Sequence, residues 1–192
     1  MKGKLITIMG INNIGKTTQQ TVLVEFLKEN GHSVTALKYP VYDLVPTGPR
    51  CNAYLREGNP ENLFPKEFQQ LCAKNRLDFQ SKLKSLLEEN DFVLAEMYTG
   101  SGICFGMADG IDKNELIDMN RNLLVPDISI LLDGERFLES REKNHNYESD
   151  DKKMKIIRDN HLELSKDFNW TVVNANQSEE KVKNDIINII FK

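Results

Sequence analysis

Short, continuous runs of apolar residues alternate along the chain with longer stretches in which apolar residues recur every three or four positions. The runs predict buried strands, and the longer stretches predict amphipathic helices. The strands are expected at 4–9, 33–39, 92–95, 128–132 and 171–173. The helices are expected at 16–30, near 50–55, from Pro65 onward, and at 114–122, 135–143, 151–168 and 179–190. This alternation indicates an α/β fold of three layers, in which helices cover both faces of a five-stranded parallel sheet.

A phosphate-binding motif follows the first expected strand. The sequence Gly10-Ile-Asn-Asn-Ile-Gly15-Lys16-Thr17 matches G-x-x-x-x-G-K-[ST], the motif of folds of the P-loop NTPase type. Glycines let backbone N–H groups point at phosphate oxygens, and the start of the following helix adds a favourable dipole. Lys16 can reach the β- and γ-phosphates, and the Thr17 hydroxyl can bind Mg²⁺. The motif predicts ATP or GTP binding through Gly10, Asn12, Asn13, Ile14, Gly15, Lys16 and Thr17.

Two polar side chains interrupt the buried stripe of the long helix that begins at Pro65. Asn75 and Arg76 lie on or beside the stripe that carries Cys72 and Phe79. An arginine that faces inward needs an anionic or hydrogen-bonding partner. Arg76 therefore either forms a structural ion pair at the edge of the core or points into a ligand cleft. Thr18 is likewise open to two interpretations, as a hydroxyl near the α-phosphate or as an ordinary threonine of a helix N-terminus.

Composition narrows the class of protein. The chain has 192 residues, 40% of them hydrophobic and 28% charged, which fits a single globular domain over 1–192. The formal net charge of −4 argues against a nucleic-acid partner, and no apolar run approaches the length that spans a membrane. The three cysteines lie far apart, so reduced thiols in a cytoplasmic protein are expected.

Taken together and in order, several short motifs resemble the thymidylate kinase family of nucleoside monophosphate kinases, and the resemblance extends from Lys4 to Ile190. Among these motifs, the phosphate loop is the one that is specific by itself. The resemblance to the family is supported by the whole ordered set at matching spacing. The matching elements are the loop through Gln19, Lys38-Tyr39-Pro40, Lys74-Asn75-Arg76, Glu96-Met97-Tyr98 with Ser101, Pro126-Asp127-Ile128, and Tyr147-Glu148.

The resemblance implies ATP, Mg²⁺ and dTMP as ligands of a homodimeric enzyme of nucleotide biosynthesis. It implies that Glu96 lies near the metal and that Arg141 reaches the transferring phosphoryl from a lid segment at about 135–150. It also implies that Asn176, in the 174–177 loop, contacts adenine, and that Arg50 binds the acceptor phosphate. The acceptor nucleoside would be held by Tyr39, Arg76, Tyr98, Ser101, Gly102 and Phe105, with Arg76 on the base.

The chain departs from the family pattern at charged and aromatic positions. Met97 replaces the arginine that holds the acceptor phosphate, and Cys72 replaces an aromatic that stacks on thymine. Further departures are Met9, Asn12, Asn13 and Asn146. Two alternatives to a dTMP kinase therefore stay open. A deoxynucleoside kinase would need a carboxylate base for a 5′-hydroxyl, such as Glu96 or Asp43. A catalytically weak relative would bind nucleotide without transferring phosphate.

Overall fold

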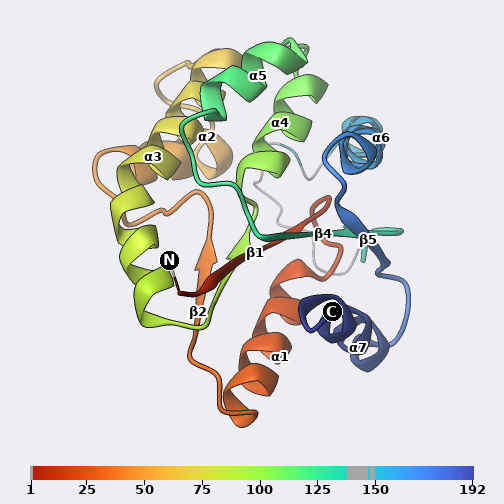
Figure 1. Ribbon diagram of the computed structural model, residues 1–192. Coiled ribbons are helices and arrows are strands. Elements are labelled where there is room, and N and C mark those ends of the chain that lie inside the picture. Colours follow the sequence, from red (N-terminus) through yellow and green to blue (C-terminus); the bar gives the residue numbers. More distant parts are fainter. Residues whose placement is uncertain (1, 138–146, 148–149) are drawn as a thin grey trace.

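The computed structural model describes residues 2–137, 147 and 150–192. Its strands form one parallel sheet in the order β2-β3-β1-β4-β5, shown in Figure 1. Their bounds are β1 Lys4–Met9, β2 Val34–Lys38, β3 Phe92–Glu96, β4 Ile128–Asp133 and β5 Thr171–Asn174. The five predicted strands and their parallel arrangement are confirmed.

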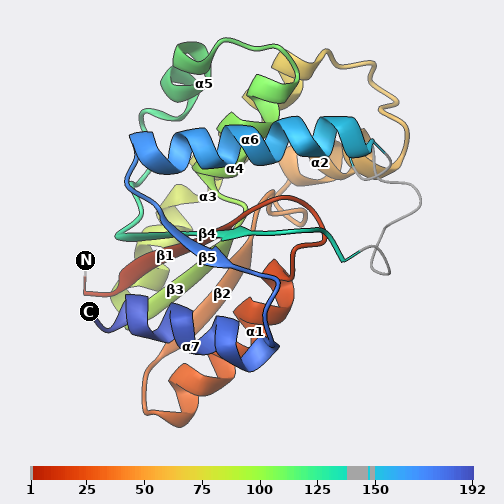
Figure 2. The same ribbon diagram turned by 90° about the vertical axis from the view of Figure 1, so that its right-hand side faces the viewer.

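Helices cover both faces of the sheet. Their bounds are α1 Lys16–Glu29, α2 Thr47–Arg56, α3 Pro65–Glu89, α4 Thr99–Ala108, α5 Lys113–Asn120, α6 Asp151–Asp167 and α7 Glu179–Ile190. In Figure 2, α1 and α7 lie below the sheet, and α3, α4 and α6 lie above it. In the part of the chain that the structure describes, no helix is both long and apolar enough to cross a bilayer.

Alternate side chains of β1 fill the core on opposite faces of the sheet. Ile6 and Ile8 belong to the buried cluster that includes Leu23 of α1. Leu5 belongs to a second cluster, which includes Leu83 of α3. A strand that is buried on both faces leaves room for ligands only beyond its ends, so the carboxyl ends of β1, β2 and β3 are where a site is expected.

Helix α4 is the element that the apolar pattern does not predict. Its sequence contains three glycines, and each glycine costs about 1 kcal/mol relative to alanine inside a helix. The structure gives a reason for each of them, because an added Cβ would lie 2.5 Å from Sδ of Met9 at Gly100, 2.6 Å from Nη2 of Arg76 at Gly102 and 2.5 Å from Cδ2 of Leu116 at Gly106. Close packing against neighbouring elements therefore outweighs the low helix propensity.

The prediction of a helix at 135–143 is wrong for the first residues of that range. Residues 135–137 are not helical, and the rest of that range lies outside the described residues. The short helix predicted near 50–55 is longer than expected, and its ten residues end at Arg56.

A buried histidine makes the stability of the fold depend on pH. His161 of α6 is 1% exposed, its Nδ1 lies 2.8 Å from the carbonyl oxygen of Ile157, and Nε2 has no partner among the described residues. Burial lowers the pKa of His161 to about 4, whereas an unfolded histidine titrates near pH 6.5. Between these two values the unfolded chain binds more protons, so its population rises as the pH falls.

We therefore expect the free energy of unfolding to fall by about 2–3 kcal/mol more in the wild type than in His161→Gln between pH 7 and pH 4. The stabilisation that neutral His161 contributes to the folded state is complete above pH 6.5 and is lost as the pH approaches 4. Urea unfolding at a series of pH values measures it. Parallel pH profiles of the two proteins would show that His161 is not the source.

Candidate active site

The phosphate loop connects β1 to α1 and has little room for side chains. Gly10 has φ 141°, and a Cβ there would lie 2.5 Å from the carbonyl oxygen of Leu132. Gly15, with φ 86°, is the N-cap of α1. The ammonium of Lys16 bridges the loop by donating to the carbonyl oxygen of Ile11 at 2.7 Å. The loop therefore presents backbone N–H groups, a helix N-terminus and a lysine to one space.

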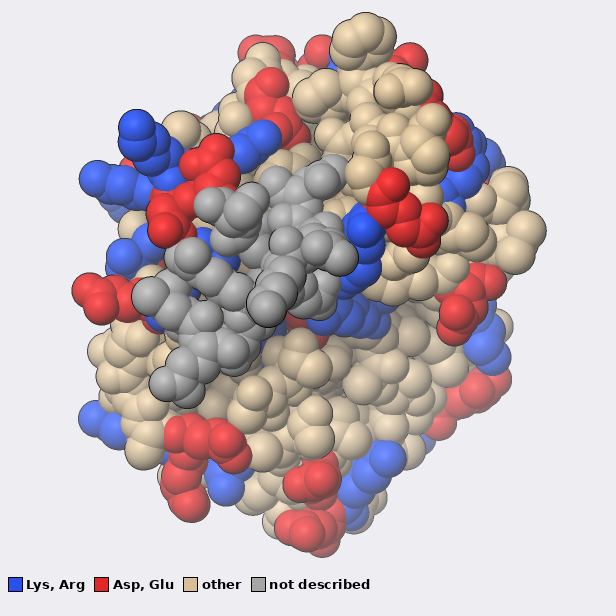
Figure 3. Space-filling model, turned by 180° about the vertical axis from the view of Figure 1, so that it is seen from behind, with Lys and Arg blue, Asp and Glu red and all other residues tan. Residues whose placement is uncertain are grey.

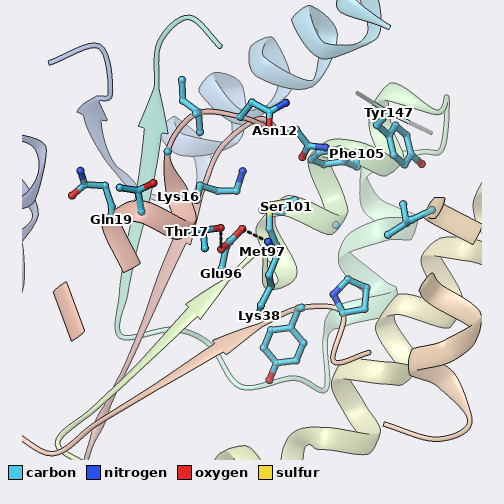
Figure 4. A pocket seen from close by; sticks show the side chains of 18 of the residues that line it. Asn12, Lys16, Thr17, Gln19, Lys38, Glu96, Met97, Ser101, Phe105 and Tyr147 are labelled. Atoms are coloured by element: carbon cyan, nitrogen blue, oxygen red, sulfur yellow. Dashed lines mark hydrogen bonds and ion pairs between the residues drawn. The ribbon is translucent and has the colours of Figure 1, made fainter. Parts of the chain in front are cut away.

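A single cavity of about 900 Å³ extends from this loop towards α3 and α4. Figure 4 shows the order of its residues: Lys16 and Thr17 lie at one end, Glu96 and Met97 in the middle, and Phe105 near the other end. The cavity is thus lined by residues at or just after the carboxyl ends of β1, β2 and β3. Further lining residues are Asn12, Asn13, Ile14, Gly15, Thr18, Gln19, Lys38, Tyr39, Cys72, Arg76, Ala175 and Gln177.

The middle of the cavity holds a chain of polar contacts. Thr17 Oγ1 donates to Oε2 of Glu96 at 2.7 Å, and Nζ of Lys38 lies 3.1 Å from Oε1. Figure 4 draws both contacts as dashed lines. Lys38 and Glu96 are neighbours because they are paired residues at the ends of β2 and β3. Both oxygens of the buried carboxylate are therefore held, one by a hydroxyl of the phosphate loop and one by a cation.

The far end of the cavity carries buried polar atoms that no described residue satisfies. Arg76 is 4% exposed and donates from Nη1 to Oδ1 of Asn120 at 3.1 Å, but its Nε has no partner. The hydroxyl of Ser101 is also buried without a partner. Unpaired buried polar atoms are rare and mark a place for a ligand or a water. This end therefore suits a ligand with hydrogen-bonding groups. The ion pair between Arg76 and a carboxylate, the alternative that the sequence left open, is not formed with any described residue.

A tyrosine covers this end beside Phe105. The ring of Tyr147 lies 5.2 Å from that of Phe105, edge to face. Its hydroxyl donates to Oδ2 of Asp109 at 2.7 Å, and Lys153 forms an ion pair with the same carboxylate. Burial raises the pKa of Tyr147 well above its usual range. The tyrosine thus remains protonated and is anchored to both α4 and α6.

Basic side chains surround the opening. Figure 3 shows Lys and Arg side chains gathered in the hollow beside the grey residues, with a largely uncharged surface below. The lining cations among the described residues are Lys16, Lys38, Arg56, Arg76 and Arg136. Although the chain as a whole is acidic, its cavity is suited to anions.

A family model described as thymidylate kinase matches residues 8–186, nearly the whole of this α/β chain and its cavity. The chain belongs to the thymidylate kinase family. It is therefore an ATP-dependent kinase, which agrees with the ATP or GTP binding that the phosphate loop predicts.

Relatives of this family resemble the chain over its full length. A probable thymidylate kinase of Archaeoglobus fulgidus is 31% identical, with 97% of this chain and 94% of the relative covered. A thymidylate kinase of Plasmodium falciparum is 26% identical, with 100% and 91% covered. The solved thymidylate kinase structure of Candida albicans has a TM-score of 0.82 at 23% identity and covers 99% of this chain and 92% of that one. At 23% identity, the likeness to the Candida albicans structure shows a shared fold.

Three of the site residues implied by the thymidylate kinase resemblance lie outside the cavity. Arg50 is exposed and forms a bidentate pair with Glu61, from Nε at 2.9 Å and from Nη2 at 2.7 Å. Tyr98 is fully buried behind the cavity, 5.0 Å from the ring of Tyr39, and burial raises its pKa to about 12. Asn176 binds the backbone of Glu135, accepting from its N–H and donating to its carbonyl oxygen.

These placements have physical reasons. The pair with Glu61 keeps Arg50 on the outer side of α2. Tyr98 begins the turn into α4 and packs into the core instead of facing the ligand side. In the loop after β5, the neighbours of Asn176, which are Ala175 and Gln177, line the cavity. Arg141 lies outside the described residues, as does most of the segment expected to form a lid.

Sequence reasoning missed several cavity residues. Arg136 lies next to the phosphate loop, because the N–H of the following residue, Phe137, donates to the carbonyl oxygen of Asn13 at 2.7 Å. The helix that was expected at 135–143 does not place Arg136 in the cavity. Arg56 and Tyr42 also line the cavity. An arginine in the last turn of a short helix normally points into solvent, so the sequence carried no signal for Arg56.

Proposed function

We propose that the chain transfers the γ-phosphoryl group of ATP to dTMP to give dTDP within this one cavity. The observation that carries the proposal is the continuity of the cavity, with a phosphate loop at one end and the unsatisfied Arg76 and Ser101 at the other. ATP would bind at the loop, with Lys16 beside its β- and γ-phosphates. The base of dTMP would lie at the far end, against Arg76, Ser101 and Phe105. The two phosphate groups would then meet in the middle.

A phosphate acceptor suits the chemistry of the middle. The second pKa of a phosphate monoester is about 6, so its oxygen is already a nucleophile at neutral pH and needs no base. The enzyme has only to position two anions and to offset their charge. Both oxygens of Glu96 are engaged by Thr17 and Lys38, and Asp43 does not line the cavity. A deoxynucleoside kinase, which needs a free carboxylate base, is therefore less well supported.

An acceptor screen tests the proposal. The protein is incubated with ATP and Mg²⁺ and with dTMP, dUMP, dCMP, dGMP, thymidine or deoxycytidine, and ADP release is measured, with Lys16→Met as the blank. We expect the highest kcat/KM with dTMP. Phosphorylation of thymidine but not of dTMP would instead indicate a deoxynucleoside kinase. No release with any acceptor would indicate a nucleotide-binding relative without activity.

The proposal includes Mg²⁺ as the cofactor. Thr17 and Glu96 offer a hydroxyl and a carboxylate 2.7 Å apart, which are the oxygen donors that Mg²⁺ prefers. Among the described residues, no group of three His, Cys, Asp or Glu side chains could hold a metal. The remaining ligands would therefore be water and phosphate oxygens, as is usual for Mg²⁺ in kinases. When bound, the metal would offset the charge of the transferring phosphates.

Glu96→Gln is expected to raise the Mg²⁺ concentration needed for half-maximal activity by about tenfold to a hundredfold. The amide keeps the size of the side chain and can still accept from Thr17, but it loses the charge. A Mg²⁺ titration of activity at saturating ATP and dTMP measures the shift. An unchanged midpoint would remove Glu96 from the metal site.

A homodimer and a cytoplasmic location belong to the proposal as well. Both rest on the family resemblance, and the second also on the three cysteines, which are free and buried. Light scattering of the purified protein tests the first.

A further inference from the structure

Two of the three free cysteines lie on the neighbouring helices α2 and α3. Cys51 is in the middle of α2 and is fully buried, and Cys72 is in α3 and is 5% exposed. Cys72 lines the cavity, whereas Cys51 does not. A small molecule in the cavity can therefore touch the thiol of Cys72 but not that of Cys51.

Contacts on either side of the two cysteines define how α2 packs against α3. Near the start of α2, Nδ2 of Asn75 donates to Oγ1 of Thr47 at 3.0 Å. Near its end, the ring of Tyr54 is stacked on that of Phe68, with the ring centroids 3.7 Å apart. The residue numbers rise along α2 while those of the partners fall along α3, so the two helices run antiparallel.

This register places the two cysteines opposite each other. Cys51 lies one helical turn from both α2 residues that make these contacts, four positions after the first and three before the second. Cys72 lies one turn from each of their partners on α3. Residues at these spacings share one face of a helix. Both thiols are therefore at the same level of the interface between α2 and α3.

Helix packing brings such a pair within reach of a covalent bond. The axes of packed helices are about 8–10 Å apart, and Cα atoms lie about 2.3 Å from the axis. Facing Cα atoms are therefore about 4–6 Å apart, which overlaps the range of about 4.4–6.8 Å that disulfides require.

The surroundings of Cys72 also favour its reactive form. As a hydrogen-bond donor, the Cys51 thiol lowers the pKa of Cys72, burial opposes this effect, and the charge of Arg76 adds to it. Arg76 lies one turn further along α3. The thiolate is the form of cysteine that attacks oxidants. Cys72 is thus both the accessible and the more reactive thiol of the pair.

We propose that Cys72 and Cys51 form a site of reversible oxidation, where a small hydroperoxide that enters the cavity converts the two thiols into a disulfide. With hydrogen peroxide, the O–O bond breaks, one oxygen becomes the sulfenic acid of Cys72, and the other leaves as water. Sγ of Cys51 then attacks the Cys72 sulfur. The S–S bond forms, the S–O bond breaks, and the hydroxyl leaves with the Cys51 proton as a second water. The peroxide takes up the two electrons that the sulfurs lose.

The acceptor nucleotide is expected to control access to this site. Cys72 precedes Arg76 by one turn of α3, and both line the cavity. The proposed function places the base of the acceptor against Arg76, so a bound acceptor would cover the Cys72 thiol. ATP at the phosphate loop would leave it open. This control by the acceptor rests on the proposed function, whereas formation of the disulfide does not.

Peptide mapping after oxidation tests the pair. The reduced protein is treated with hydrogen peroxide, the remaining thiols are alkylated after denaturation, and the tryptic peptides are weighed. We expect fragments 51–56 and 67–74 as one linked species, lighter by two hydrogens than the two free peptides together. Dithiothreitol should separate them. Cys104, which is fully buried and does not line the cavity, should remain open to alkylation.

Cys51→Ala is the matched variant, because it removes the second thiol and leaves Cys72 in place. Oxidation of Cys72 should then continue to the sulfinic acid, which dithiothreitol does not reverse. Cys104→Ala should form the same linked peptide as the wild type. Thermal melting confirms that the variants are folded. A folded wild type that gives no linked peptide, or that gives Cys72 sulfinic acid while Cys51 stays free, would overturn the inference.

Protection by ligands tests the control by the acceptor. With dTMP at ten times its dissociation constant, about a tenth of the cavities are free, so loss of the Cys72 thiol should slow about tenfold. ATP at the same relative concentration should change the rate by less than about twofold. If dTMP binds without protecting Cys72, or if ATP protects equally, the acceptor does not control access to the site. If the disulfide forms but calorimetry detects no binding of dTMP, the proposed function is wrong and the thiol pair stands.

Discussion

Replacing Lys16 by alanine is expected to lower turnover by about a thousandfold or more while the fold remains intact. The ammonium lies at the N-terminus of α1 and points into the cavity, where it would offset the charge that develops between the β- and γ-phosphates. Removing one such preorganised donor typically costs a hundredfold to a thousandfold in rate, and a full charge costs more. Steady-state kinetics with ATP and dTMP measures the loss.

A control separates the charge of Lys16 from its packing. Lys16 is 6% exposed, so its aliphatic stem contributes to the wall of the loop. Lys16→Met keeps most of that stem and should lose as much activity as Lys16→Ala, with a thermal midpoint close to that of the wild type. Turnover near the normal rate in either variant would contradict phosphoryl transfer at this loop.

Arg76→Met is expected to weaken the binding of dTMP and of thymidine alike by about 2–3 kcal/mol, or about 30-fold to 150-fold. Arg76 lies at the end of the cavity with an unsatisfied Nε, so its partner would be the base, which both ligands share. ATP affinity should not change. Calorimetric titration with the three ligands measures this pattern.

A loss of ATP affinity in Arg76→Met would place Arg76 on the donor side instead. ATP binding at the opposite end of the cavity is the control for correct folding of Arg76→Met. If ATP binds normally, a lower thermal midpoint of the variant does not account for the weaker binding of dTMP and thymidine.

The sequence predicted the sheet because buried parallel strands leave a signal of their own. Runs such as Phe92–Ala95 are apolar at every position, and glycines or prolines end the neighbouring elements. Helix α4 left no such signal, because seven of its ten residues are buried and it has no polar face to alternate with an apolar one. Its helical form depends on packing against α3, α5 and α6, which lie far away in sequence or follow later.

The site was predictable where its chemistry is local. The phosphate loop is one contiguous segment, and Arg76 stood out because a charge interrupted a buried stripe. Arg56 and Arg50 are six residues apart on α2, and no sequence pattern says which one faces inward. Their placement depends on partners in space, Tyr42 for one and Glu61 for the other. The placement of Asn176 also depends on a partner in space, because its side chain accepts a hydrogen bond from the backbone N–H of Glu135.

Both nucleotides are expected to bind end to end in one cavity, with their phosphates meeting in its middle. A bisubstrate analogue, in which adenosine and thymidine are joined through their 5′-oxygens by a pentaphosphate chain, tests this most directly. The inhibition pattern is measured while ATP and dTMP are varied in turn. We expect inhibition that is competitive towards ATP and also towards dTMP. Inhibition that is competitive towards ATP alone would contradict it.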